Sequence, residues 1–235
     1  MRTHSIDYYS KRLLSPRSLV LDVHSLADYI NAATAIRESY PKREVYFRGQ
    51  ASTAWEISST AYREIEKETE KPFQRQLQEL HEQLVDAVKH LHDTDLNQRK
   101  GVGLLAHLQH NGAKTNLIDY TKNPLVALWF ACRERPGESG AVYYLEHDRK
   151  KTPEIQSEDS VKELFSDSGL RVFDPPNLNQ RIVNQQGLFL FDVSGKINKD
   201  MHGKIMIDSA QKKSFCSILR IVGFRTAVFF RIWPV

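Results

Sequence analysis

Hydrophobic and polar positions follow helical spacing through much of the first half of the chain. Between residues 25 and 39, apolar side chains recur every three or four positions behind Ser25, a residue type suited to an N-cap. Between residues 72 and 92, phenylalanine, leucine and valine form one stripe, while glutamine, glutamate, lysine and histidine occupy the other positions. The spacing predicts an amphipathic helix in each segment, with the longer stripe packed against a sheet or a partner helix.

Two further helices are predicted around a glycine and a proline. One runs from about Leu96 to His110 and is broken by Gly112. The next begins at Pro124, directly after Asn123, which suits the N-cap position. This last helix is apolar nearly all round, so it is expected at the centre of the molecule.

The second half of the chain is rich in β-branched and aromatic residues between glycine, proline and aspartate breakers. Strands are predicted at residues 43–49, 140–146, 170–174, 187–193, 203–208 and 225–233. A final helix is predicted from Ser209 to Gly223. Residues 50–64 are expected to form a loop with short turns, and the charged residues 147–165 to face solvent. Helices followed by a strand-rich half predict an α+β fold.

Composition places the chain among ordinary globular proteins. It has 235 residues, 40% hydrophobic and 26% charged, which fits one domain with an N-terminal extension at residues 1–23. Two cysteines provide no disulfide framework, so a reducing, cytoplasmic location is predicted. No apolar run reaches the ~18 residues of a membrane span. Lysine and arginine exceed aspartate and glutamate by 33 to 29, which permits a nucleic acid partner.

Several common catalytic motifs are absent from the sequence. There is no P-loop, and the glycines at 101–103 lack the third glycine and the preceding strand of a dinucleotide-binding turn. There is also no G-x-S-x-G elbow. His107 and His110 lie three apart on one helix face without a cysteine or acid grouped nearby, so no metal site is predicted. A weaker alternative uses either histidine as the general acid or base of an RNA-cleaving effector.

Two stretches, residues 46–64 and 104–134, carry more polar detail than packing requires. Together with residues 179–191, they resemble the FRG domain family, named for its Phe-Arg-Gly motif. The opening motif is matched by Phe47-Arg48-Gly49-Gln50 with Trp55 and Arg63. The longest motif is matched by "LLAHLQHNGAKTNLIDYTKNPLVALWFA", and the third by "NQRIVNQQGLFLF". The resemblance runs from about residue 24 to the C-terminus and implies a single FRG domain at 24–235.

A more distant resemblance joins these motifs to mono-ADP-ribosyltransferases of the toxin or phage-defence type. In those enzymes an Arg-Gly ends the first strand, a Ser/Thr segment leads into an apolar helix, and a late strand carries a glutamate. The arginine holds NAD, the Ser/Thr segment shapes the nicotinamide pocket, and the glutamate steadies the reacting ribose. The resemblance implies N-terminal helices packed on a strand-rich split-sheet core, with NAD as the substrate.

This resemblance implies a set of site residues. The catalytic candidates are Arg48, Thr121 and Gln186. The candidates for binding NAD are Arg48, Gly49, Gln50, Thr115, Asp119, Tyr120 and Thr121. Further candidates are His110, Arg181 and Gln185. Arginine suits phosphates through its bidentate fork, and Gly49 is expected to let a ligand approach the backbone. Gln185 and Gln186 are expected on a strand, facing opposite ways, with Gln186 in the site.

The sequence departs from the transferase pattern because glutamine replaces the glutamate. Three interpretations stay open: the acceptor needs little base help, Asp119 supplies the negative charge, or the domain binds a nucleotide without turnover. Asp119 alternatively forms a buried ion pair with Arg48 or Arg181.

The leading expectation is a toxin or defence effector that transfers ADP-ribose from NAD to a macromolecule, with RNA favoured over protein. The alternative is a non-catalytic module that binds a nucleotide or a protein. A toxin also implies an antitoxin or inhibitor protein that covers the pocket.

Overall fold

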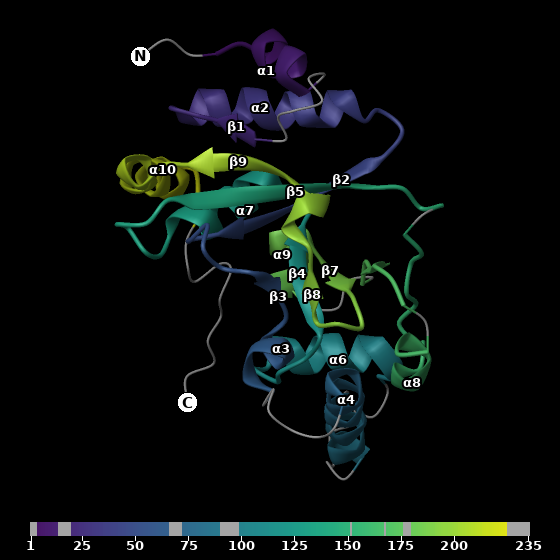
Figure 1. Cartoon of the computed structure of the whole chain (residues 1–235). Helices are drawn as coiled ribbons and strands as arrows, with labels where there is room; N and C mark the ends of the chain where they lie inside the picture. The colour runs from purple at the N-terminus through teal and green to yellow at the C-terminus, as the bar shows by residue number, and fades with distance from the viewer. Residues whose placement is uncertain are drawn as a thin grey trace.

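A seven-stranded mixed sheet organises the protein in the computed structural model (Figure 1). The structure describes residues 4–13, 20–65, 72–89, 99–150, 152–166, 168–175 and 180–224. The order across the sheet is β1 (Val20–Asp22), β9 (Gly203–Ile207), β5 (Gly140–His147), β2 (Glu44–Gln50), β4 (Leu117–Thr121), β7 (Gly187–Phe191) and β6 (Arg171–Phe173). Strand β1 runs parallel to β9, and the other neighbours are antiparallel. A second, two-stranded sheet joins β3 (Ile57–Ser58) to β8 (Lys196–Ile197).

Helices precede, connect and follow these strands. The described helices are α1 (Ile6–Leu13), α2 (Leu26–Ser39), α3 (Thr60–Glu64), α4 (Phe73–Lys89), α6 (Gly101–His110), α7 (Pro124–Cys132), α8 (Val161–Leu164), α9 (Gln180–Gln185), the 3-10 helix η1 (Lys199–Met201) and α10 (Ser209–Ile221). In the part of the chain that the structure describes, no helix combines the length and apolar character needed to cross a membrane.

The large sheet consists of two halves that meet at one residue pair. Phe47 of β2 pairs with Thr121 of β4, and this is the one pair in the register between those strands. By contrast, β2 pairs with β5 along its whole length. The strands of the two halves run in different directions (Figure 1). The sheet therefore splits next to the Phe-Arg-Gly motif.

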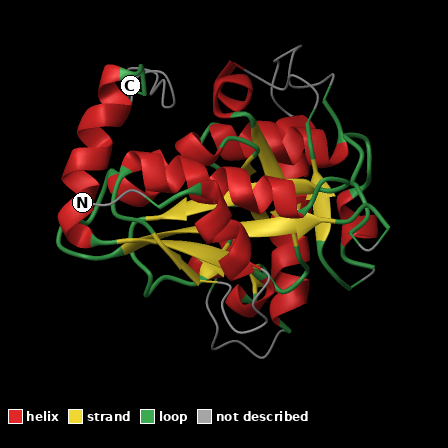
Figure 2. Ribbon diagram, turned by 90° about the horizontal axis from the view of Figure 1, so that it is seen from above, coloured by secondary structure: helices red, strands yellow, loops and turns green. Residues whose placement is uncertain are grey.

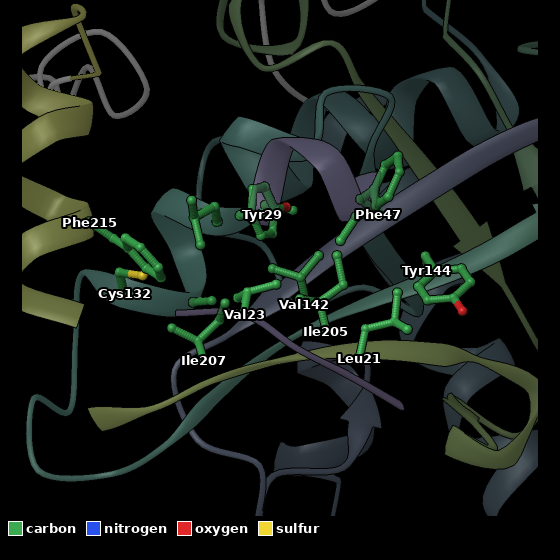
Figure 3. Packing of buried hydrophobic residues seen from close by; sticks show 14 of the residues in the cluster. Leu21, Val23, Tyr29, Phe47, Cys132, Val142, Tyr144, Ile205, Ile207 and Phe215 are labelled. Carbon is green, nitrogen blue, oxygen red and sulfur yellow. The ribbon is translucent and has the colours of Figure 1, made fainter. Parts of the chain in front are cut away.

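The main hydrophobic core lies between one sheet face and helices α2, α7 and α10. Val142 and Ile205, from neighbouring strands, point into this core with Phe47, while Cys132 of α7 lies beside Phe215 of α10 (Figure 3). Seen from above, helices cover much of the sheet (Figure 2). Six of the nine residues of α7 are buried, so the prediction of a central apolar helix is confirmed.

Two smaller cores complete the interior. One packs α6, α8 and α9 against β7, with Ile155, Val161 and Leu164 buried in it. The prediction that the charged segment 147–165 faces solvent is therefore correct only in part, because its apolar residues are buried in this core. The other core covers the opposite face of the large sheet and includes Tyr46, Tyr120, Tyr143 and residues of the small sheet.

The predicted α+β class is confirmed, and most predicted elements are present. The Ser25 hydroxyl accepts a hydrogen bond from Asp28 N at 3.1 Å, and Asn123 likewise caps α7. No strand is predicted between Gly112 and Pro124, where the structure has the interior strand β4, and residues 20–22 of the predicted extension form β1. Part of the loop predicted at 50–64 is ordered as β3 and α3. The predicted strand at 225–233, Leu91 and residues 96–98 lie outside the described residues.

Candidate functional site

The sheet register brings the three motif stretches side by side. Phe47 pairs with Thr121 across β2 and β4, and Thr121 pairs with Gly187 across β4 and β7. The Phe-Arg-Gly strand, the Asp-Tyr-Thr strand and the Gln-Gly turn therefore meet on three neighbouring strands. The split between the two sheet halves begins at this meeting point.

Strand alternation separates the proposed catalytic residues between two faces of the sheet. Paired residues of antiparallel strands point to the same face, so Thr121 lies with Phe47 on the side of α7. Arg48 points to the opposite face, where its guanidinium carbon lies 5.9 Å from the centre of the Tyr120 ring. Arg48 and Thr121 are neighbours along the backbone and do not share a pocket wall.

Arg48 is half-buried, and not all of its guanidinium N–H groups have a hydrogen-bond acceptor among the described residues. Its Nη1 donates to the backbone oxygen of Asp119 at 2.6 Å. Its Nε is buried and makes no hydrogen bond to any residue that the structure describes. A buried guanidinium nitrogen without an acceptor is costly unless a ligand supplies one. The geometry therefore favours an anion at Arg48.

A second guanidinium, Arg63 of α3, lies in the same electrostatic neighbourhood. Its Nη1 donates to Ser58 O at 2.7 Å. Burial lowers the pKa of Arg63, and the positive charge of Arg48 lowers it further, while the Asp119 carboxylate opposes this effect. Two arginines that repel one another provide a strong local field for a phosphate group.

Asp119 does not form the buried ion pair that the sequence suggested with Arg48. The residue is exposed, and its carboxylate accepts a hydrogen bond from Gln109 Nε2 at 3.2 Å. Gln109 Oε1 in turn accepts from the Thr115 hydroxyl, which also accepts from Leu117 N at 3.1 Å. Thr115 is fully buried, so its hydroxyl orients Gln109 and the start of β4. The alternative partner Arg181 has a side chain outside the described part of the structure.

Tyr120 forms a buried pair with His202. The Tyr120 hydroxyl lies 2.7 Å from His202 Nε2, and His202 Nδ1 lies 3.1 Å from Asn198 O. Because a carbonyl only accepts, Nδ1 carries the proton and Nε2 accepts from Tyr120. Burial lowers the pKa of His202 to about 4, and the charge of Arg48 contributes to the decrease. Burial also raises the pKa of Tyr120, so this pair is neutral.

Thr121 has a buried hydroxyl whose contacts are local. It donates to Gln185 O at 2.6 Å and accepts from Asn123 N at 2.9 Å, which ties the end of α9 to the start of α7. The prediction that Gln185 and Gln186 lie on a strand is wrong, because Gln185 ends α9. Gln186 follows it in a left-handed conformation, with φ of 46°. Gln185 is buried and Gln186 is exposed.

Gly49 faces helix α7 and not an open surface. A Cβ atom built on Gly49 would lie 1.8 Å from the backbone oxygen of Ala127. The glycine therefore permits the closest approach of α7 to β2, where the sequence suggested an approach by a ligand. Gln50 is buried, and its Nε2 donates to Glu56 O at 2.9 Å.

With this geometry established, comparison with known proteins gives one match. Residues 43–139 match the FRG domain family. This segment, called the FRG segment below, supports the FRG resemblance and contains Arg48, Arg63 and Asp119. The third motif, with Gln185 and Gln186, lies beyond it. No curated protein and no solved structure matches the chain at a significant level.

The FRG segment also contains the histidine pair of α6. The His110 ring packs at an angle against Phe189 of β7, with ring centres 5.8 Å apart. Within the described residues, no group of three or more histidine, cysteine, aspartate or glutamate side chains is arranged to hold a metal ion. His107 is partly buried on the same helix.

A pocket of about 780 Å³ opens beside the small sheet. Most of the residues that line it lie outside the FRG segment. Lys199 lines it, and the Lys199 ammonium lies 5.8 Å from the centre of the Tyr143 ring. Tyr143 is the cross-strand neighbour of Arg48. The pocket therefore lies next to the arginine site, although Arg48 and Tyr120 are not among its lining residues.

Sequence reasoning missed several buried polar residues of this region. Asn116 of the FRG segment receives a hydrogen bond from the Ser59 hydroxyl at 2.9 Å, and its backbone N–H donates to His81 Nε2 at 2.8 Å. His202 holds Tyr120 from outside the segment. A buried polar side chain has no periodic signature, so only the fold identifies these partners.

Proposed function

We propose that the chain binds an NAD-type dinucleotide where β2 meets β4 and transfers its ADP-ribose to a macromolecule. The observation that carries this proposal is Arg48, a half-buried guanidinium with an unused buried Nε beside a second arginine, Arg63. A diphosphate has the charge and the acceptor atoms that two such groups require. Such an activity fits a toxin or defence effector of the ADP-ribosyltransferase type.

The proposed chemistry places specific demands on the site. Cleavage of the bond between nicotinamide and ribose builds positive charge on the ribose, so the diphosphate must be held while that charge develops. Arg48 and Arg63 would hold it. Tyr120 is buried under Arg48, and its contact with the guanidinium fixes the position of that group.

The negative charge that stabilises the ribose is assigned to Asp119 in this proposal. The glutamines of the third motif carry no charge, and Asp119 is exposed and held by Gln109. Its carboxylate acts on Arg63 electrostatically, which supports this role even though strand alternation puts Asp119 on the face of Thr121 and not on that of Arg48. The acceptor is assigned to nucleic acid, in particular RNA, because lysine and arginine exceed aspartate and glutamate by 33 to 29.

Labelled NAD tests the proposal directly. The protein is incubated with NAD labelled in its adenylate phosphate, with total RNA or with cell lysate, and label transfer and nicotinamide release are measured. Arg48→Ala is expected to lower both by about 100-fold or more, the range seen when one preorganised donor is removed. The control is Arg75→Ala, because Arg75 is an exposed arginine of α4 that pairs with Glu79.

The control variant should match wild type. The proposal is rejected if wild-type protein neither transfers label nor releases nicotinamide, or if Arg48→Ala keeps wild-type activity.

A second candidate is a module that binds the nucleotide without turnover. It is favoured by the engaged hydroxyl of Thr121 and the exposed, uncharged Gln186. In that case, calorimetry on the same proteins would show saturable NAD binding that Arg48→Ala abolishes, with no nicotinamide release.

A further inference from the structure

Basic side chains continue from the arginine site across the face of the large sheet. Arg48 on β2 pairs in register with Tyr143 on β5, and Tyr143 pairs with Lys204 on β9. Paired residues point to the same face, so Arg48 and Lys204 flank Tyr143 on one surface. Neighbouring strands lie about 4.8 Å apart, which separates the backbones of Arg48 and Lys204 by about 10 Å.

A lysine from outside the large sheet joins this surface. Lys199 of η1 lies over Tyr143, and its ammonium donates to Thr53 O at 2.9 Å. The side chain is partly buried. Burial lowers the pKa of Lys199, and repulsion from Lys204 lowers it further, while Glu56 opposes the change. Lys199 and Lys204 are therefore close enough to repel one another, as Arg48 and Arg63 do.

These four cations, Arg63, Arg48, Lys199 and Lys204, are called the basic row. Within the described residues, none of them forms an ion pair with a carboxylate. Other lysines of the chain do form such pairs, for example Lys114 with Glu64 at 2.8 Å. Asp119 and Glu56 offset the repulsion only in part, since the positive neighbours still lower the pKa of Arg63 and of Lys199. A polyanion relieves such repulsion between cations.

We propose that the basic row holds the phosphate backbone of a single-stranded nucleic acid, the acceptor of the proposed reaction. Arg48, Lys199 and Lys204 follow one line across Tyr143, with Arg63 acting on Arg48. One line of charges matches one phosphodiester backbone, whereas a duplex presents two. The basic row includes Arg48, so an RNA strand bound along it would pass the site proposed for the dinucleotide. Tyr120 and Tyr143 are each 3% exposed, so they support the cations from below and are not free to stack on bases.

Two properties distinguish a surface that binds phosphates from one that recognises the base sequence of RNA. Binding through phosphates weakens steeply with salt, with a slope in log affinity of about 0.7 per contact for single strands. Binding without base stacking or base-edge contacts is also similar for different homopolymers. Both properties are measurable without NAD, so the inference deepens the proposed function but is tested separately from it.

The experiment measures fluorescence anisotropy of labelled RNA of roughly ten nucleotides, without NAD, over a series of salt concentrations. The test variant is Lys199→Gln with Lys204→Gln, because glutamine keeps a donor for Thr53 while removing the charge. The control variant is Lys42→Gln with Lys213→Gln, which removes two exposed lysines elsewhere. Thermal unfolding of each variant establishes that it is folded.

The test variant is expected to bind RNA about tenfold more weakly at about 0.1 M salt, with a salt slope smaller by about 1.4. The control should stay within about twofold of wild type, since it lacks only diffuse charge. Polyuridine and polyadenosine should bind alike, and a duplex of equal length should bind more weakly.

The inference is overturned if wild type does not bind RNA at low salt, if the test variant matches the control, or if the duplex binds more tightly. Labelling of a protein instead of RNA, unchanged in the test variant, would also overturn it. RNA binding that depends on the basic row without any transfer of ADP-ribose would uphold this inference and reject the proposed function.

Discussion

Individual residues of the site are governed by burial and by what remains for each polar atom to contact. Arg48 keeps an unused buried nitrogen, whereas the Thr121 hydroxyl already has both a donor and an acceptor. His202 is 4% exposed and carries its proton on the nitrogen that faces Asn198 O. These contacts make Arg48 available to a ligand and make Thr121 and His202 supports for the backbone and for Tyr120.

His202 makes stability dependent on pH. Its folded pKa is about 4, below the ordinary value of 6.5, so the unfolded chain takes up the proton first as the pH falls. Stability contributed by the neutral histidine is therefore complete above about pH 6.5 and is lost towards pH 4. Wild type should lose about 1–2 kcal/mol more unfolding free energy than His202→Gln between about pH 7 and pH 5.

Denaturant unfolding of both proteins at the two pH values measures this difference. His81, whose pKa burial also lowers to about 4, is present in both proteins, so the comparison isolates His202. Equal losses in wild type and His202→Gln would show that His202 is not held neutral in the fold.

Among the secondary-structure elements, the contact between α7 and β2 sets the geometry of the site. Helix α7 begins directly after its N-cap Asn123, two residues beyond the end of β4 at Thr121. The middle of α7 lies against Gly49. Gly140 of β5 meets the same helix, because a Cβ atom there would lie 2.6 Å from Ala131 O. Glycines at these two points let an apolar helix lie close to the strand that carries Arg48.

Gly49→Ala is expected to destabilise the protein by about 3 kcal/mol, the upper part of the range for overpacking a core. The physical reason is that the new methyl group would overlap the Ala127 backbone, so β2 or α7 must shift. Chemical denaturation measures the loss. Gly137→Ala is the matched control, since nothing lies within 4 Å of a Cβ atom at Gly137.

The control should change stability by less than about 0.5 kcal/mol. A Gly49→Ala protein as stable as this control would show that α7 does not need the glycine.

At the scale of the whole molecule, Asn116 connects parts of the chain that are distant in sequence. Its side chain accepts from the Ser59 hydroxyl before α3 and donates to Asp192 O after β7 at 2.6 Å. Its backbone N–H donates to His81 of α4. Asn116 is fully buried, so these bonds hold α4, β4 and the end of β7 together.

Asn116→Ala is expected to lower the free energy of unfolding by about 3 kcal/mol, because it leaves the Ser59 hydroxyl and the Asp192 carbonyl without their buried partner. Asn111→Ala is the control, since Asn111 is exposed and its side chain donates to His107 O at 3.0 Å within the same helix end. Thermal and chemical unfolding compare the two variants. Equal stability of both would contradict a structural role for Asn116.

Sequence patterns were enough to predict the α+β class, a helix within residues 25–39, a helix beginning at Pro124, and Arg48 as a candidate site residue. Hydrophobic periodicity and N-cap residues depend on a few neighbouring positions, so they can be recognised in the sequence alone. The same local reasoning predicted no strand at β4, because "LIDYT" is short and its strand character comes from pairing with β7. It also placed Gln186 on a strand, although a left-handed turn precedes β7.

Which of these residues meet follows from the tertiary structure. The register aligns Phe47, Thr121 and Gly187 on three strands, places Arg48 and Thr121 on opposite faces, and assigns Gly49 to the packing of α7. It also gathers the basic row from separate elements and pairs Tyr120 with His202, which lies 82 positions away in the chain. Such pairings depend on how strands align across the sheet, and that alignment is fixed by packing of the whole chain and not by local preference.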